Sequence, residues 1–161
     1  MVILLMGVAG SGKTTVGRTL ATALGWSFYD ADDFHPAANI AKMSAGQPLT
    51  DADRAPWLAA LRAHLDACLA RGESAVVACS ALKASYRAAL IADPLNIRLV
   101  HLAGDPALLA ARMHSRPGHY MKPEMLASQL DALEPPADAL TVDIALPPDT
   151  SVAQIRAALS V

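Results

Sequence analysis

The sequence predicts an α/β fold in which a five-stranded parallel sheet is covered by helices on both faces. Short aliphatic runs alternate with longer helical patterns along the chain, and these runs are continuously apolar. Continuous apolar runs are typical of parallel strands whose two faces are both buried. The 161 residues contain no internal repeat and no long linker, so we expect one domain spanning residues 1–161.

Each expected element has a local signal. The apolar run VILLM predicts the first strand, and a glycine-rich loop separates it from the first helix. Asp105-Pro106 supplies an N-cap followed by proline at the first helical position, and Gly72 is a C-cap signal. The expected strands are residues 2–6, 27–29, 75–79, 97–102 and 141–145, and the expected helices are 12–24, 53–71, 84–92, 106–115, 123–133 and 152–159.

Composition excludes several classes of protein. Hydrophobic residues make up 53% of the chain and charged residues 17%, which disfavours disorder. A net charge of −2 disfavours a general nucleic-acid binder. The apolar N-terminus lacks a basic segment and is shorter than the roughly 18 residues of a membrane span, so we expect a cytoplasmic protein without membrane partners. Cys68 and Cys79 are too few for a disulfide framework and lack metal-ligand spacing.

A phosphate-binding loop follows the first expected strand. The segment GVAGSGKT matches G-x-x-x-x-G-K-[ST] between a strand and a helix, as the motif requires. Its glycines allow backbone N–H groups to point at phosphate oxygens, and the helix start adds a positive dipole end. The loop therefore predicts a bound nucleotide, with Lys13 on the β- and γ-phosphates and Thr14 on Mg²⁺. The expected nucleotide-binding residues are Gly7, Gly10, Ser11, Gly12, Lys13, Thr14 and Thr15.

Acidic residues follow the second expected strand. Asp30, Asp32 and Asp33 lie close together, and like charges so near one another favour a bound cation or a hydroxyl-rich ligand. In a phosphotransferase one carboxylate holds Mg²⁺ and another accepts the proton of the attacking hydroxyl group. The sequence leaves the division of these roles open. His35 either contacts the substrate or caps a local turn.

Basic residues occur where an anionic substrate could bind. Arg54 lies among Asp51 and Asp53 at a helix start, where acids stabilise the helix and could also orient Arg54 toward an anion. Lys83 and Arg87 are four residues apart and share one face of the next expected helix. That pair suits a carboxylate or a phosphate, although a solvated helix face also explains it.

A second basic pair, Arg112 and Arg116, leads into a loop bounded by Pro117-Gly118 and Pro123. A basic helix end followed by such a loop predicts a small mobile lid, about residues 112–123, that brings arginines onto the phosphates when it closes. A helix end stabilised by positive charge is the alternative.

The chain resembles the bacterial gluconokinase family, whose members are P-loop kinases with the nucleoside-monophosphate-kinase type of fold. The resemblance runs from about residue 2 to residue 134. It implies that ATP phosphorylates the 6-hydroxyl group of D-gluconate, and it makes a homodimer the expected assembly. The segments that carry it are GVAGSGKTT, DADDFHPAANIAKMSAGQPLTDADRAPWL, CSALKASYR and RMHSRPGHYM.

The resemblance also implies roles for individual residues. Adenine is expected between Arg112 and the loop at Pro147, by similarity to related small kinases. Asp33 departs from the apolar residue expected there, and the chain beyond Leu140 matches little of the family pattern. The implied catalytic residues are Lys13, Asp30, Asp32 and Arg116, the Mg²⁺ ligands are Thr14 and Asp30, and the sugar-acid contacts are Asp32, His35, Arg54, Lys83, Arg87 and His119.

Other functions stay open at this point. Shikimate kinase is another small kinase with a D-x-D pair, but it expects a glycine triplet where this chain has Cys79-Ser80-Ala81. A further sugar or hydroxy-acid kinase and a non-catalytic nucleotide-binding module are the remaining alternatives.

Overall fold

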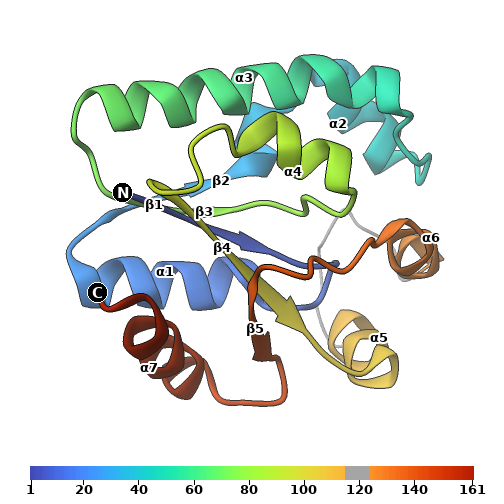
Figure 1. The fold of residues 1–161 in the computed structure, drawn as a ribbon. Coiled ribbons are helices and arrows are strands. Elements are labelled where there is room, and N and C mark those ends of the chain that lie inside the picture. The colour runs from blue at the N-terminus through green and yellow to red at the C-terminus, as the bar shows by residue number, and fades with distance from the viewer. Residues whose placement is uncertain (115–123) are drawn as a thin grey trace.

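The computed structural model describes residues 1–114 and 124–161, and it has helices on both sides of a central sheet (Figure 1). Residues 115–123, which make up most of the lid predicted at about residues 112–123, lie outside the described part of the chain. The elements in chain order are β1 (Val2–Met6), α1 (Lys13–Leu24), β2 (Ser27–Asp30), the 3₁₀ helix η1 (Ala31–Phe34), α2 (Ala37–Ser44), α3 (Asp51–Ala70), β3 (Ala75–Ala78), α4 (Ala84–Leu90), β4 (Ile97–Ala103), α5 (Pro106–His114), α6 (Glu124–Ala132), β5 (Leu140–Asp143) and α7 (Pro148–Leu159).

The five strands form one sheet in the order β2-β3-β1-β4-β5, and every pairing is parallel. This confirms the predicted fold class. Because β1 lies between β3 and β4, its carboxyl end lies at the middle of the sheet edge that the carboxyl ends of the five strands form. Open parallel sheets bind their ligands at that edge. The phosphate loop, η1 and the segment 79–83 leave the sheet there, and each follows a different strand.

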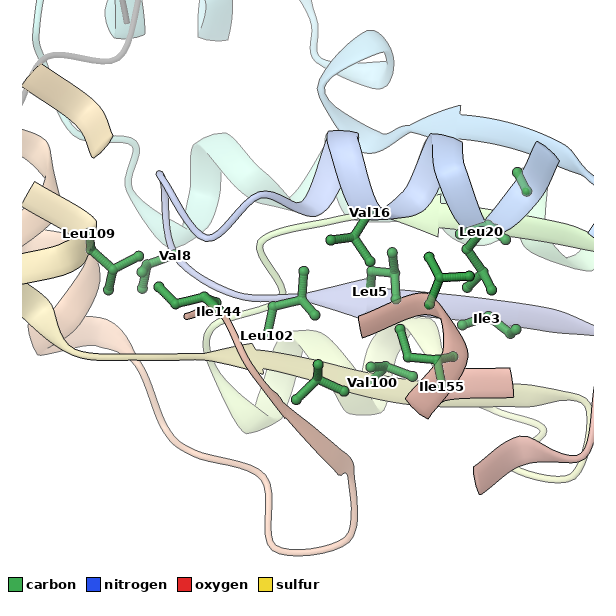
Figure 2. Packing of buried hydrophobic residues seen from close by; sticks show 14 of the residues in the cluster. Ile3, Leu5, Val8, Val16, Leu20, Val100, Leu102, Leu109, Ile144 and Ile155 are labelled. Carbon is green, nitrogen blue, oxygen red and sulfur yellow. The ribbon is translucent and has the colours of Figure 1, made fainter. Parts of the chain in front are cut away.

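Two apolar clusters hold the layers together. One joins Ile3 and Leu5 of β1 to α1 and α7, with Val16, Leu20 and Ile155 fully or almost fully buried (Figure 2). The other joins the opposite face of β1 to α3 and α4 and contains Trp57, Leu61, Leu65 and Cys68. Both faces of β1 are therefore covered, which is why its sequence is apolar at every position.

The predicted elements match the structure closely, apart from shifts of one or two residues at several ends and the following differences. The sequence did not predict η1 or α2. It placed the start of α3 at residue 53, whereas α3 begins at Asp51 behind a capping box between Thr50 and Asp53. It placed the start of the last helix at residue 152, whereas α7 begins at Pro148, a residue suited to the first helical turn.

Both cysteines are buried and free. No helix among the described residues is long and apolar enough to cross a membrane.

Candidate active site

The phosphate loop leaves the start of α1 open to a ligand. Gly12 is the N-cap residue with φ 87°, and no side chain of the described residues caps this helix end. The first N–H groups of a helix have no partner within the helix, and together with the helix dipole they attract anions. The start of α1 therefore presents backbone donors of the kind that phosphate oxygens need.

Glycine is required in this loop for two reasons. Gly10 has φ 80°, and a Cβ atom there would lie 3.0 Å from the Leu109 carbonyl oxygen and 3.1 Å from the Met113 side chain. At Gly7 a Cβ atom would lie only 2.7 Å from the carbonyl oxygen of Leu102 on β4. The loop thus passes so close to β4 and α5 that side chains are excluded at both positions.

The hydrogen bonds of three polar groups in the phosphate loop indicate how the loop can bind a ligand. Lys13 lies over the loop, and its Nζ donates to the carbonyl oxygens of Gly7 (2.8 Å) and Val8 (3.0 Å). The N–H of Ala9 donates to Oε1 of Gln129 on α6 (2.7 Å). The Ser11 Oγ is buried and has no hydrogen-bond partner among the described residues. A buried polar atom without a partner is costly, and a phosphate oxygen would satisfy it.

Two cavities meet at Gly10 and Gly12. The larger, about 490 Å³, lies over the carboxyl ends of β1, β2 and β3, and the smaller, about 270 Å³, lies beside β4 and the start of α7. The larger cavity is lined by the predicted site residues Lys13, Thr14, Asp30, Asp32, His35, Arg54 and Lys83, and the smaller by Ser11, Thr15 and Arg112.

Asp30 connects the acidic segment to the phosphate loop. Its Oδ2 accepts a hydrogen bond from the Thr14 hydroxyl (3.0 Å), and its Oδ1 accepts one from the N–H of Asp32 (3.2 Å). A hydroxyl group and a carboxylate side by side are hard oxygen donors of the type that Mg²⁺ prefers. The chemistry of this pair therefore fits the predicted magnesium site.

Trp57 fixes the position of the acidic segment. Its indole Nε1 donates to the carbonyl oxygen of Ala31 in η1 (2.7 Å), and the side chain is 2% exposed. The His35 ring stacks on Trp57, with ring centroids 4.5 Å apart and planes 11° apart. The sequence analysis assigned no role to Trp57, although its place in the PWL segment was part of the resemblance.

A cationic cluster lines the opposite part of the large cavity. Lys83 donates to both carboxylate oxygens of Asp51 (2.8 and 2.9 Å), and the Tyr86 hydroxyl also donates to Asp51. These bonds lower the pKa of Asp51 below its ordinary value and raise that of Lys83. Arg54 lies 3.8 Å from Asp51 and donates to the carbonyl oxygen of Leu49. Two cations and one carboxylate give the cluster a net charge of +1.

The structure places Lys83 and Arg87 in different surroundings, although both were predicted to contact the sugar acid. Lys83 lies before the first turn of α4 and lines the cavity, whereas Arg87 is buried beneath it. The Arg87 Nη1 donates to the carbonyl oxygens of Ala81 (3.1 Å) and Leu82 (2.9 Å). Ala81 has φ 43°, a left-handed conformation that residues with a Cβ atom rarely adopt. Arg87 therefore stabilises the segment behind the cavity and does not line the cavity.

We expect Arg87→Ala to lower the free energy of unfolding by about 1.5–3 kcal/mol, because two buried carbonyl groups lose a charged donor. The KM for the phosphoryl acceptor should stay near the wild-type value. Urea unfolding and steady-state kinetics measure the two effects. Arg98→Ala, which removes an exposed arginine from β4, should change stability by no more than about 0.5 kcal/mol. A large rise in KM with unchanged stability would show that Arg87 reaches the substrate after all.

The predicted adenine contacts lie around the smaller cavity. Arg112 donates through Nη2 to the carbonyl oxygen of Ile144 (2.7 Å), which joins α5 to the segment after β5. Leu146 and Pro148, on either side of Pro147, line the same cavity. Two further predicted site residues, the catalytic candidate Arg116 and the sugar-acid contact His119, lie outside the described residues.

Several lining residues were not predicted from the sequence. Asp51 was predicted to stabilise a helix start or to orient Arg54, and Ser128 and Gln129 were assigned no role, yet all three line the large cavity. Polar residues on a helix are ordinarily solvated, so only the packing of α6 beside the phosphate loop distinguishes Ser128 and Gln129.

Comparison with known proteins places the chain among small kinases. A family described as an AAA domain matches residues 2–136. The chain is 52% identical over 136 residues to a gluconokinase of Gluconobacter oxydans (strain 621H), covering 84% of this chain and 76% of that protein. It is 40% identical over 156 residues to the thermoresistant gluconokinase of Escherichia coli (strain K12), covering 94% and 89%.

Solved structures agree with these relatives. A gluconokinase from Sinorhizobium meliloti 1021 is 43% identical, with a TM-score of 0.83 over 98% of this chain and 94% of that one. A shikimate kinase from Aquifex aeolicus vf5 is 21% identical, with a TM-score of 0.61 over 99% and 96%. At that identity the second comparison supports the fold alone.

Proposed function

The chain belongs to the gluconokinase family, and from this membership we propose that it transfers the γ-phosphoryl group of ATP to the 6-hydroxyl group of D-gluconate. One observation carries the proposal beyond the relatives: a single cavity joins the phosphate loop, a pair of aspartates and a separate cationic cluster. A sugar acid offers a terminal hydroxyl group to the phosphate loop and the aspartates, and a carboxylate to the cationic cluster.

ATP fits the phosphate loop through the open start of α1 and the unsatisfied Ser11 hydroxyl. We propose that Thr14 and Asp30 hold Mg²⁺ beside it. Bound there, Mg²⁺ would neutralise part of the phosphate charge. The smaller cavity, lined by Arg112 and Leu146, is the proposed adenine site.

In the proposed reaction Asp32 accepts the proton of the 6-hydroxyl group while Lys13 and the loop N–H groups stabilise the charge on the γ-phosphoryl oxygens. Positioning the hydroxyl group in line with the phosphorus supplies most of the remaining rate enhancement in such sites. Lys83 and Arg54 bind the carboxylate at the other end of the substrate, and this fixes which hydroxyl group reaches Asp32.

Lys83→Met is expected to raise the KM for gluconate about ten- to a hundredfold, because a charged hydrogen bond contributes about 1.5–3 kcal/mol. The KM for ATP should change little. The matched control is Arg62→Met, because Arg62 also donates to both oxygens of one aspartate, Asp66, at 2.8 and 2.9 Å, but does not line the cavity. Equal KM values for gluconate in the two variants would show that Lys83 does not bind the substrate.

The substrate itself is tested by measuring ADP release with gluconate, shikimate and AMP side by side. Turnover with gluconate alone supports the proposal. Turnover with shikimate and none with gluconate would contradict it, and ATP binding without turnover of any acceptor would favour a non-catalytic module. A homodimer stays a prediction, which light scattering of the purified protein tests directly.

A further inference from the structure

We propose that Asn39 is a positioning residue that fixes the tautomer of His35, so that His35 presents its Nε2–H group to a hydroxyl group of the substrate. The identity of that substrate rests on the proposed function, whereas the tautomer does not. Asn39 lies on α2, the helix that the sequence analysis missed, and its side chain is buried.

The orientation of the Asn39 amide follows from its first neighbour. The Asn39 side-chain nitrogen lies 2.8 Å from the backbone carbonyl oxygen of Asp53. A carbonyl oxygen only accepts hydrogen bonds, so the amide group must place its NH₂ there and not its own oxygen. The opposite orientation would set two acceptors against each other in a buried position.

The tautomer of His35 follows from the second neighbour. The same Asn39 nitrogen lies 3.3 Å from Nδ1 of His35. An amide nitrogen offers only hydrogens, so Nδ1 must be the unprotonated acceptor. In a neutral imidazole the proton is then on Nε2.

The Nε2 side of the ring lies at the cavity. Nε2 is 4.0 Å from Oδ1 of Asp32, and both residues line the large cavity. That distance is too long for a direct hydrogen bond. A substrate hydroxyl group can bridge the two, because it accepts from Nε2–H and donates to the carboxylate. Stacking on Trp57 keeps the ring in the plane that this bridge requires.

The surroundings favour the neutral ring. Burial and the nearby Arg54 charge lower the pKa of His35 below its ordinary value, and Asp32 opposes them with a smaller effect than burial. A neutral ring with a proton on Nε2 donates at the cavity. The other tautomer would present a lone pair toward the Asp32 carboxylate and could not hold the bridging hydroxyl group.

The direct test is long-range ¹H–¹⁵N NMR of the labelled wild-type protein, with His35 assigned by the signal missing in His35→Gln. We expect ¹⁵N shifts typical of an unprotonated Nδ1 and a protonated Nε2. A protonated Nδ1 in the free wild-type protein would overturn the proposal, and this measurement needs neither a variant of Asn39 nor a substrate.

The functional test is Asn39→Asp, which replaces the amide with a carboxylate of the same shape. The new side chain can only accept, so the bond to the Asp53 carbonyl is lost and Nδ1 of His35 becomes protonated. At a pH where the ring stays neutral, Nε2 then carries no proton, and we expect kcat to fall about tenfold or more, the cost of one hydrogen bond made in the transition state. Gln154→Glu, the same change on the exposed face of α7, should leave kcat unaltered.

A double-mutant cycle separates positioning from general damage. If Asn39 acts through His35, then Asn39→Asp should lower kcat in the wild-type background but add little in the His35→Gln background. Equal losses in the two backgrounds would overturn the proposal. If gluconate is not turned over while Nε2 carries the proton, the proposed function fails and the tautomer assignment stands.

Discussion

Lys13→Ala is expected to reduce kcat at least about a hundred- to a thousandfold while the protein stays folded, the loss found when one preorganised donor to transition-state charge is removed. Lys13 is the first residue of α1 and lines the cavity, at a helix end that no side chain of the described residues caps. Phosphoryl transfer spreads charge over the equatorial oxygens, and electrostatic stabilisation of that charge, together with positioning, supplies most of the catalysis. Single-turnover phosphorylation of gluconate measures the chemical step itself.

The control for this variant is Arg18→Ala. Arg18 lies on the same helix, five residues after Lys13, with its guanidinium group 5.0 Å from the centre of the Phe28 ring. The Arg18→Ala variant removes one positive charge from α1, and Arg18 lines neither cavity. Its kcat should therefore stay within about twofold of the wild-type value, the range expected of a distant surface change. Near-normal ATP consumption by Lys13→Ala would invalidate the whole site assignment.

The sheet and the phosphate loop were predictable because their signals are local. A strand buried on both faces must be apolar throughout, and β1 was predicted with its observed bounds, Val2–Met6. The loop needs glycines at fixed positions for steric reasons that the structure makes explicit at Gly7 and Gly10. No distant part of the chain had to be known for either inference.

Helix α2 and the direction of Arg87 were not predictable in the same way. An isolated helix of eight residues is unstable, so α2 depends on the contact of Asn39 with Asp53 and of Lys42 with the same residue. The spacing in the sequence put Arg87 on the same helix face as Lys83. In the structure the Arg87 guanidinium group instead donates to the carbonyl oxygens of residues 81 and 82. Sequence spacing gives the face of a helix and does not show what lies against it.

The acidic segment was predicted as a group, and the structure separates its members. Asp30 contacts the Thr14 hydroxyl group. Asp32 lines the cavity with its Oδ1 4.0 Å from Nε2 of His35, and Asp33 does not line the cavity. The sequence could not divide the roles because all three carboxylates follow the same strand. The turn of η1, held by Trp57, points them in different directions.

Asp32→Asn is therefore expected to lower kcat about 10²–10⁴-fold, the usual contribution of a general base. The amide keeps the shape of the side chain and its place in η1 but cannot accept the proton of the 6-hydroxyl group. Asp33→Asn is the matched control, because it removes the same charge one residue away at an exposed position, and its kcat should stay close to the wild-type value.

Asp30→Asn distinguishes the base from the proposed metal ligand. The neutral amide of this variant would bind Mg²⁺ more weakly than the carboxylate, so activity should require a higher Mg²⁺ concentration and recover in part when more is supplied. Asp32→Asn should not recover at any Mg²⁺ concentration, since its defect is proton transfer. Titrating Mg²⁺ against initial rate in both variants measures this difference. If Asp32→Asn were rescued by Mg²⁺ and Asp30→Asn were not, the two roles would have to be exchanged.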